Sequence, residues 1–251
     1  MAIELITNTV WRDSALVLPT DNANAASADT ADIENISRGP RHLEWAQSGT
    51  AVRRLVYENK RGNLSANRCI ITRSDRYTAG YVIRKYSTYS SSATSIETTA
   101  SAPTGIGQNS QDYLASFTLA SSQQAFSVEF LGSTAKIVNK IVFGEALSFA
   151  YPQAPTISPY WGSYASGRKN YLCSEVMTLR FSGEPQATIT TLESQWLIHE
   201  EPCFLYDSAG TVLADKLWHC VIGSLTVSQL FYDLYDIEMQ VFRLREYPSV
   251  T

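Results

Sequence analysis

Three histidines are the side chains best suited to proton transfer near neutral pH, and they lie far apart, at His42, His199 and His219. A Ser–His–Asp triad is recognised by geometry and not by order along the chain, so these positions alone do not exclude one. The sequence contains no GxSxG turn, which exposes the nucleophilic serine in one large class of hydrolases. Glu200 and Glu201 would be paired carboxylates for acid–base chemistry, but adjacent acidic residues after a helix usually form a solvated helix end. These residues therefore favour a protein that is not an enzyme.

Metal and nucleotide sites also lack their sequence patterns. The cysteines show no CxxC spacing and are expected to be buried and reduced: Cys69, Cys173, Cys203 and Cys220. Cys203 and Cys220 could face each other across neighbouring strands, although two ligands do not make a zinc site. The Asp- and Asn-rich segment 20–41 lacks the glycine-centred pattern of a calcium loop, and neither a GxxxxGK[ST] nor a GxGxxG motif is present. We expect no metal and no cofactor.

Aromatic residues gather in the Pro- and Gly-containing segment 149–170. Tyr160, Trp161 and Tyr164 either form a stacking platform for a sugar or base, or pack against the flank of a domain, which is the commoner role of such residues. They are our candidate contacts to a glycan or a partner. The Ser- and Thr-rich segment 87–111 is too polar for a core, so we expect an exposed loop that either carries binding residues or is a tolerated insertion.

Composition excludes several classes of partner. The net charge of −4 and the pI near 5.4 give no basic field for nucleic-acid binding, and the Arg- and Lys-rich stretch 53–61 is balanced by carboxylates elsewhere. The chain has no apolar run of the length that spans a bilayer and no signal-like start. We therefore expect synthesis in the cytoplasm and no membrane insertion.

The elements that would position these residues are mainly strands. Short apolar runs from residue 42 onward recur with the spacing of a sandwich, and Phe126 and Val128 alternate with polar neighbours. This pattern predicts a β-sandwich over 1–150, followed by a linker over 151–170.

The remaining segment, 171–251, predicts a strand, one helix over about 184–199, a short strand and two long strands. Pro185 suits the first turn of that helix, and its predicted apolar face consists of Ile189, Leu192 and Trp196. In the last strand, apolar residues alternate with Asp236, Glu238 and Gln240, so this polar face meets either solvent or the wall of a wet channel.

The order of these elements resembles tailed-phage and prophage tail-tip proteins. The likeness in the first half lies in ENISRGPRHLEWAQSGTA, AVRRLVYENKRGNLSANRCIITRSD and SVEFLGSTAKIVNKIVFGEAL. In the second half it lies in SGRKNYLCSEVMTLRFSG, EPCFLYDSAGTVLADKLWHCVIGSLTV and DLYDIEMQVFRLREY. The resemblance implies a discoidin-like, galactose-binding-type jelly roll followed by a tail-tube-like β module. The segment 87–111 departs from it, and the dispersed cysteines do not match the clustered cysteines that hold an iron–sulfur cluster in related tail-tip proteins.

The resemblance further implies a structural virion protein, a distal tail or minor tail protein. It would form a hexameric or trimeric ring that joins the tail-tube protein to the hub or receptor-binding parts. Asp236, Glu238 and Gln240 would line the channel, through which DNA passes without specific binding. The alternative function is a carbohydrate-binding module for host-surface glycans. A hydrolase acting on cell-wall material through His219 or Glu200 is the third and least favoured hypothesis.

Overall fold

The structure is a computed structural model. It describes residues 3–7, 15–20, 45–46, 53–58, 64–73, 81–86, 97–101, 104–106, 112–130, 137–149, 153–166, 169–198, 203–207 and 217–244. The chain divides into two compact units. The first, here the sandwich unit, comprises Asn8–Glu145 with Tyr247–Thr251; the second, the C-terminal module, comprises Met1–Thr7 with Ala146–Glu246. The described residues are mainly β, in antiparallel sheets, which confirms the expected fold class.

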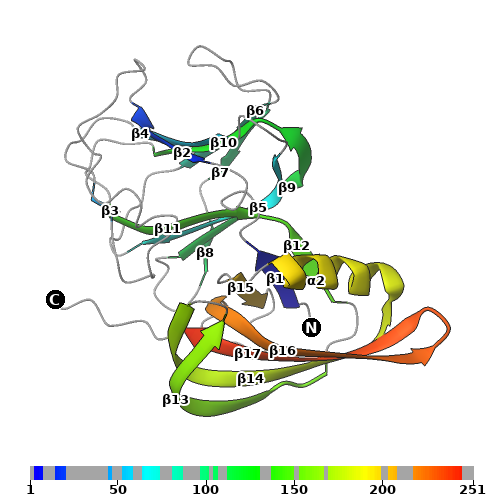
Figure 1. Cartoon of the computed structure of the whole chain (residues 1–251). Helices are drawn as coiled ribbons and strands as arrows, with labels where there is room; N and C mark the ends of the chain where they lie inside the picture. The colour runs from blue at the N-terminus through cyan, green and yellow to red at the C-terminus, as the bar shows by residue number, and fades with distance from the viewer. Residues whose placement is uncertain are drawn as a thin grey trace. The chain divides into compact units, whose positions relative to one another are not determined.

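Over its described residues, the sandwich unit forms two five-stranded sheets (Figure 1). The first has the order β2 (Ala15–Thr20), β4 (Arg53–Glu58), β10 (Ala125–Phe130), β6 (Tyr81–Tyr86), β7 (Glu97–Ser101). The second has the order β3 (Trp45–Ala46), β11 (Ile137–Gly144), β5 (Leu64–Arg73), β9 (Asp112–Gln123), β8 (Thr104–Ile106).

One core lies between the two sheets, because each contributes alternate side chains to the same buried cluster. Phe126 of β10 packs against Phe143 of β11 with ring centroids 5.3 Å apart, and Tyr57 of β4 meets the same ring edge-on at 5.7 Å. The polar residues of β10 are buried as well: Ser127 is hydrogen-bonded with Tyr86, and Glu129 pairs with Arg84. β10 is the central strand of its sheet, so both of its edges are paired, and the burial of Ser127 and Glu129 shows that the face opposite the core cluster is covered at these two residues as well.

The segment 87–111 is not wholly a loop. β7 and β8 lie within it, each at an edge of one sheet, while residues 87–96, 102–103 and 107–111 fall outside the described residues. The threonines of these two strands explain the difference, since β-branched side chains suit a pleated backbone even where the composition is polar.

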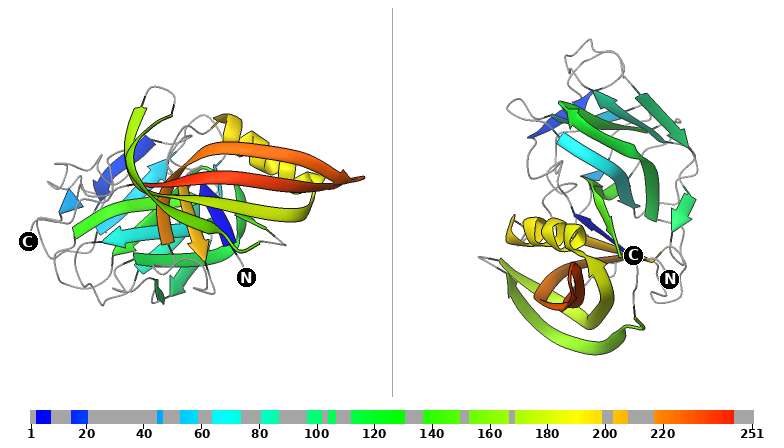
Figure 2. Two further views of the ribbon diagram at one scale, coloured as in Figure 1. Left: turned by 90° about the horizontal axis from the view of Figure 1, so that it is seen from below. Right: turned by 90° about the vertical axis from the view of Figure 1, so that its right-hand side faces the viewer.

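The C-terminal module contains a seven-stranded antiparallel sheet (Figure 2). Its order is β12 (Ala146–Ser148), β1 (Ile3–Thr7), β15 (Cys203–Asp207), β16 (Leu217–Phe231), β17 (Leu234–Leu244), β14 (Lys169–Pro185), β13 (Thr156–Ser166). Two expected boundaries differ. The first residues pair with β15 and so belong to this module, and most of the expected linker 151–170 is the edge strand β13.

The helix of the module, α2, spans Gln186–Ile198, as the segment 184–199 predicted. Near the end of β14, Gly183 lies in the irregularity between Phe181 and Glu184, and its φ of 75° is one that glycine adopts without strain. On the predicted apolar face of α2, Ile189 and Leu192 are buried, as expected. The side chain of Trp196 lies outside the described part of the structure.

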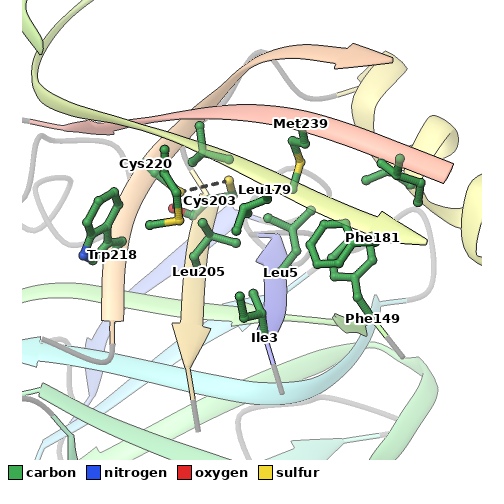
Figure 3. Close-up of a cluster of buried hydrophobic side chains, with 14 of the residues drawn as sticks. Ile3, Leu5, Phe149, Leu179, Phe181, Cys203, Leu205, Trp218, Cys220 and Met239 are labelled. Carbon is green, nitrogen blue, oxygen red and sulfur yellow. Dashed lines mark hydrogen bonds between the residues drawn. The ribbon is translucent and has the colours of Figure 1, made fainter. Parts of the chain in front are cut away.

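The core of the module lies on one face of its sheet, against α2 (Figure 3). The apolar residues of β17 point into it: Ile237, Met239 and Val241 are at most 2% exposed. Phe149 stacks on Phe181 at 3.9 Å, so this aromatic of the junction segment is a packing residue.

Candidate functional surfaces of the C-terminal module

The face of the sheet opposite the core carries a polar surface across three neighbouring strands. The register places Thr226, Glu238 and Arg180 side by side on β16, β17 and β14. We call the following residues the polar surface: Ser224, Thr226 and Ser228 of β16, Asp236, Glu238 and Gln240 of β17, and Thr178, Arg180 and Ser182 of β14. The alternation seen in the sequence of the last strand therefore continues over its two neighbours.

Contacts within this polar surface hold its charged groups in place. Arg180 Nε donates to Glu238 Oε2 over 2.8 Å, and the Ser182 hydroxyl donates to Asp236 Oδ1 over 2.5 Å. The ion pair is half exposed, with side-chain exposures of 50% and 46%, so it contributes little to stability. An open hollow of about 320 Å³ lies at this surface, lined by Gln153, Arg180, Phe181, Thr226, Ser228, Asp236, Ile237 and Glu238. With one cation against two carboxylates, the surface is weakly acidic.

The structure separates the three candidate aromatic residues. Tyr160 and Tyr164 pack on Phe242, with ring centroids 4.9 and 4.6 Å away. The Tyr164 hydroxyl donates to the Gly223 carbonyl over 2.8 Å, and burial raises the pKa of that hydroxyl. Trp161 is 76% exposed. The three rings therefore do not form one platform: two are largely packing residues, and Trp161 alone presents most of its ring to solvent.

Trp161 belongs to an apolar strip at the edge of the sheet. Ile157 pairs with the core residue Met177, so it lies on the core side of β13, beyond the area that the core covers. Leu172, opposite Ser163, lies on the same side as Trp161, because Tyr164 and Cys173 occupy the other face. We call Ile157, Trp161 and Leu172 the edge patch; Ile157 and Leu172 are 39% and 47% exposed.

A second exposed apolar group closes the β16–β17 hairpin. The hairpin end consists of Leu230, Phe231, Tyr232 and Leu234, which are 56%, 64%, 75% and 41% exposed. Phe231 pairs with Leu234, which leaves a two-residue turn, and Tyr232 adopts a φ of 45°. That backbone region disfavours a bulky side chain, and Asn or Gly usually occupies it in such turns. An aromatic residue retained there is a reason to look for a function in its side chain.

Hydrogen bonds and strand pairing brace this hairpin end. The Gln229 side chain donates to the Tyr232 carbonyl, and the Gln186 backbone N–H at the start of α2 donates to the Asp233 carbonyl over 3.1 Å. β14 follows β17 as far as the Pro185–Leu234 pair. In Figures 1 and 2 the closed end projects past α2. The hairpin end therefore combines exposed apolar side chains with a fixed backbone.

By its position between two long strand patterns, the stretch SQLFYD predicts a connection and no more. The signal that could have identified it is the run Leu230, Phe231, Tyr232 at a turn without glycine, asparagine or proline, since exposed runs of this kind are unusual unless functional.

The cysteines behave as buried thiols. All four are free, and Cys203 and Cys220 are register partners on β15 and β16 with their sulfur atoms 3.7 Å apart (Figure 3). Burial, followed by the hydrogen bond with Cys203, raises the pKa of the Cys220 thiol. The question that the sequence left open is therefore answered: the two residues are close.

Other candidates for chemistry are not brought together. His219 is buried and stacks on Phe204 at 4.8 Å, while His42, His199, Glu200 and Glu201 lie outside the described residues. Over the described ranges, no group of three or more His, Cys, Asp and Glu side chains could hold a metal ion. Within the same ranges, no helix has the length and apolarity needed to cross a membrane.

Comparison with known proteins yields structural similarity alone. No protein-family model and no curated protein matches the chain. A Ruminococcus gnavus GH29 fucosidase in complex with fucose is 12% identical over 56% of this chain and 27% of its own, with a TM-score of 0.40. The chain thus spans about a quarter of the fucosidase's length.

Two carbohydrate-binding modules are matched over nearly their whole length. The CBM32 of AlyQ, in complex with 4,5-unsaturated mannuronic acid, is 16% identical over 51% of this chain and 95% of its own, with a TM-score of 0.36. Chitosan-binding module 2 of a Paenibacillus sp. IK-5 chitosanase/glucanase, in complex with chitotriose, is 14% identical over 53% and 97%, with a TM-score of 0.36. Of the functions weighed on the sequence, glycan binding has a counterpart among these three structures, and none of them is a phage tail protein. At these values the similarity assigns neither ligand nor activity to this chain.

Proposed function

We propose that this chain is a non-catalytic assembly protein that docks onto other protein subunits through its C-terminal module. One observation carries the proposal. Among the side chains that the structure describes, every exposed large apolar one lies in the module, at the hairpin end or in the edge patch. Contiguous exposed apolar groups on a folded domain mark interaction sites, because leaving them in water is costly.

The assembly we propose is the tip of a phage tail, because the chain's sequence resembles phage tail-tip proteins. Two features support it. The hairpin end is rigid, which reduces the entropy lost on docking. The polar surface is weakly acidic, so as a channel wall it would repel DNA phosphates and not retain them. Tail-tube and hub proteins would then be the partners, and the virion the location.

The test is to locate the protein. Purified phage particles are analysed by quantitative mass spectrometry and by immunogold labelling, and the recombinant chain is sized by light scattering at micromolar concentration. Labelling at one end of the tail, with a fixed copy number per particle, is expected. A chain that is absent from particles and monomeric alone contradicts the proposal.

Glycan binding is the second candidate function, and the exposed indole of Trp161 is the observation that favours it. An aromatic face of this kind can stack on the apolar face of a sugar ring. Glycan-array binding by the wild-type chain that is lost in Trp161→Ala and kept in Tyr160→Phe would support it. Tyr160 is the matched control, because it packs on Phe242. A blank array rejects this candidate and leaves the assembly function.

A further inference from the structure

The two exposed apolar groups of the module cannot meet within one chain. The hairpin end lies beside Pro185, at the end of β14, while Leu172 of the edge patch lies near the start of the same strand. Thirteen residues of extended strand separate these positions, which at about 3.3 Å per residue corresponds to roughly 40 Å. Any contact between the two groups is therefore a contact between two molecules.

We infer that the hairpin end of one copy of this chain docks onto the edge patch of a second copy, a head-to-tail contact that rests on the proposed assembly function. Leu230, Phe231, Tyr232 and Leu234 would pack against Ile157, Trp161 and Leu172. Because the two surfaces differ, the contact is heterologous, and repetition gives a ring if the rotation closes.

The chemistry of the two surfaces favours this occupant. The hairpin end carries one charged residue, Asp233, and the stretch SQLFYDLY contains no lysine or arginine. An anionic bilayer would attract a basic segment and repel this one. The edge patch offers a leucine, an isoleucine and a tryptophan. Glu175, which pairs with Pro159 between Ile157 and Trp161 on the same face, has its carboxylate bound by Arg243, so the contact would mainly join apolar side chains.

Buried area explains why closure matters. From the exposed fractions, and taking 150–250 Å² for a fully exposed aromatic side chain, the hairpin end offers on the order of 400 Å² and the edge patch about 300 Å². Their sum of about 700 Å² is below the roughly 1,200–2,000 Å² of a stable interface. One contact is therefore weak, whereas a closed ring gives each copy two contacts and a high effective concentration.

Complementary variants test the inference in the full-length chain. The end variant combines Phe231→Ser with Tyr232→Asn, since asparagine tolerates the positive φ at that position. The patch variant combines Trp161→Thr with Leu172→Thr, which suit exposed strand positions. Ser228→Thr, on the same hairpin but in the polar surface, is the matched control. Circular dichroism confirms folding, and analytical ultracentrifugation gives the size.

The expected result is oligomers for the wild type and the control, and monomers for either variant alone. An equimolar mixture of the two variants should form dimers and nothing larger, and only at higher concentration than the wild type needs to assemble, because one intact hairpin end still finds one intact edge patch but no ring can close. The inference is wrong if the wild type stays monomeric up to high micromolar concentration, if either variant alone keeps the wild-type size, or if the mixture assembles at the same concentration and to the same size as the wild type. Binding of the monomeric wild type to phosphatidylcholine vesicles, lost in the end variant, would assign the hairpin end to a membrane and also overturn it.

Photo-crosslinking covers the case in which a variant misfolds. With p-benzoylphenylalanine in place of Tyr232, crosslinks between copies should map by mass spectrometry to peptides that contain Trp161 or Leu172. Crosslinks to another region contradict the inference. If the chain is present in phage particles but fails these tests, the proposed function stands and this contact is rejected. If it passes these tests but is absent from particles, the contact stands and the tail-tip assignment is rejected.

Discussion

Gly223 is the position at which one added methyl group should have the largest calculable effect on the module. A Cβ atom there would lie 2.1 Å from Cε2 and 2.7 Å from Cδ2 of Phe242, far inside the 3.5–4.0 Å of favourable carbon contact. Phe242 cannot simply turn aside, because it is 8% exposed and held between Tyr160 and Tyr164. Gly223→Ala should therefore destabilise the module by about 1–3 kcal/mol, the usual cost of overpacking.

The sign of the effect should reverse when the ring is removed. Gly223 does not have a positive φ, so alanine fits its backbone and by itself should stabilise by about 0.4–1 kcal/mol. In a Phe242→Ala background, Gly223→Ala is thus expected to raise stability, which gives a coupling energy of about 1.5–4 kcal/mol in the double-mutant cycle. Gly162→Ala is the matched control, since its nearest aromatic atom, on the partly exposed ring of Tyr160, is 3.2 Å away.

Hydrogen exchange by mass spectrometry, on peptides that cover β16 and β17, measures these free energies in the module itself and avoids the separate unfolding of the two units. Equal effects of Gly223→Ala in both backgrounds, or an effect below that of Gly162→Ala, would show that the ring does not occupy this position.

Four further predictions concern other parts of the molecule. Burial raises the pKa of Tyr57, so the stability of the sandwich unit should hold below the unfolded-state value of about 10 and fall as the pH rises beyond it. Tyr57→Phe should lessen that fall in pH-dependent thermal unfolding, and part of it should remain because burial also raises the pKa of Cys69 in the same core. The same variant should gain about 1 kcal/mol, because the Tyr57 hydroxyl has no hydrogen-bond partner among the described residues; a loss of stability would contradict this. Arg180→Met removes a half-exposed ion pair and should change the free energy of unfolding by less than about 0.5 kcal/mol. Arg243→Met removes a less exposed ion pair and a contact over the Trp218 ring, so it should cost about 1 kcal/mol. Equal values for the two variants in urea denaturation would refute the distinction. Mild oxidation with diamide should form a disulfide between Cys203 and Cys220. The reason is that directly opposite residues of an antiparallel pair, whether or not they are hydrogen-bonded to each other, have their Cα atoms within disulfide range. Mass spectrometry would detect the disulfide as the loss of two hydrogens, and the Cys203→Ser variant should not show it.

The sequence alone determined which residues of the best-patterned elements face inward. Period-two alternation placed Ile237, Met239 and Val241 in the core and Asp236 on the opposite face, as the structure has them. The helix was equally readable from apolar residues on one face and from Pro185, although the structure places this proline at the end of β14, one residue before α2, and not in the first turn. These features depend on neighbours within a few residues, so no knowledge of distant pairing is needed to read them.

Only the tertiary structure decided which strands are neighbours and which faces are covered. β1 and β15 pair although nearly the whole chain separates them, and nothing near Ile3 in the sequence indicates this. Ser127 looked solvent-facing by alternation, yet the strands on either side of β10 and the cluster that contains Tyr86 bury it. A residue's exposure depends on elements that the fold brings beside it, which local periodicity does not encode.

The aromatic residues and the hairpin end show the same division. Tyr160, Trp161 and Tyr164 are all aromatic, and the sequence alone does not show which of them is buried. Phe242, which is far from them in the sequence, packs against the two tyrosine rings, whereas Trp161 is left exposed. Tyr232 became notable once strand pairing had placed it at the tip of a hairpin with a positive φ. The sequence by itself determined a mainly β fold, the helix α2 and an amphipathic last strand. Which apolar side chains remain unburied, and hence which surfaces we propose for docking, was decided by the packing of segments remote in sequence.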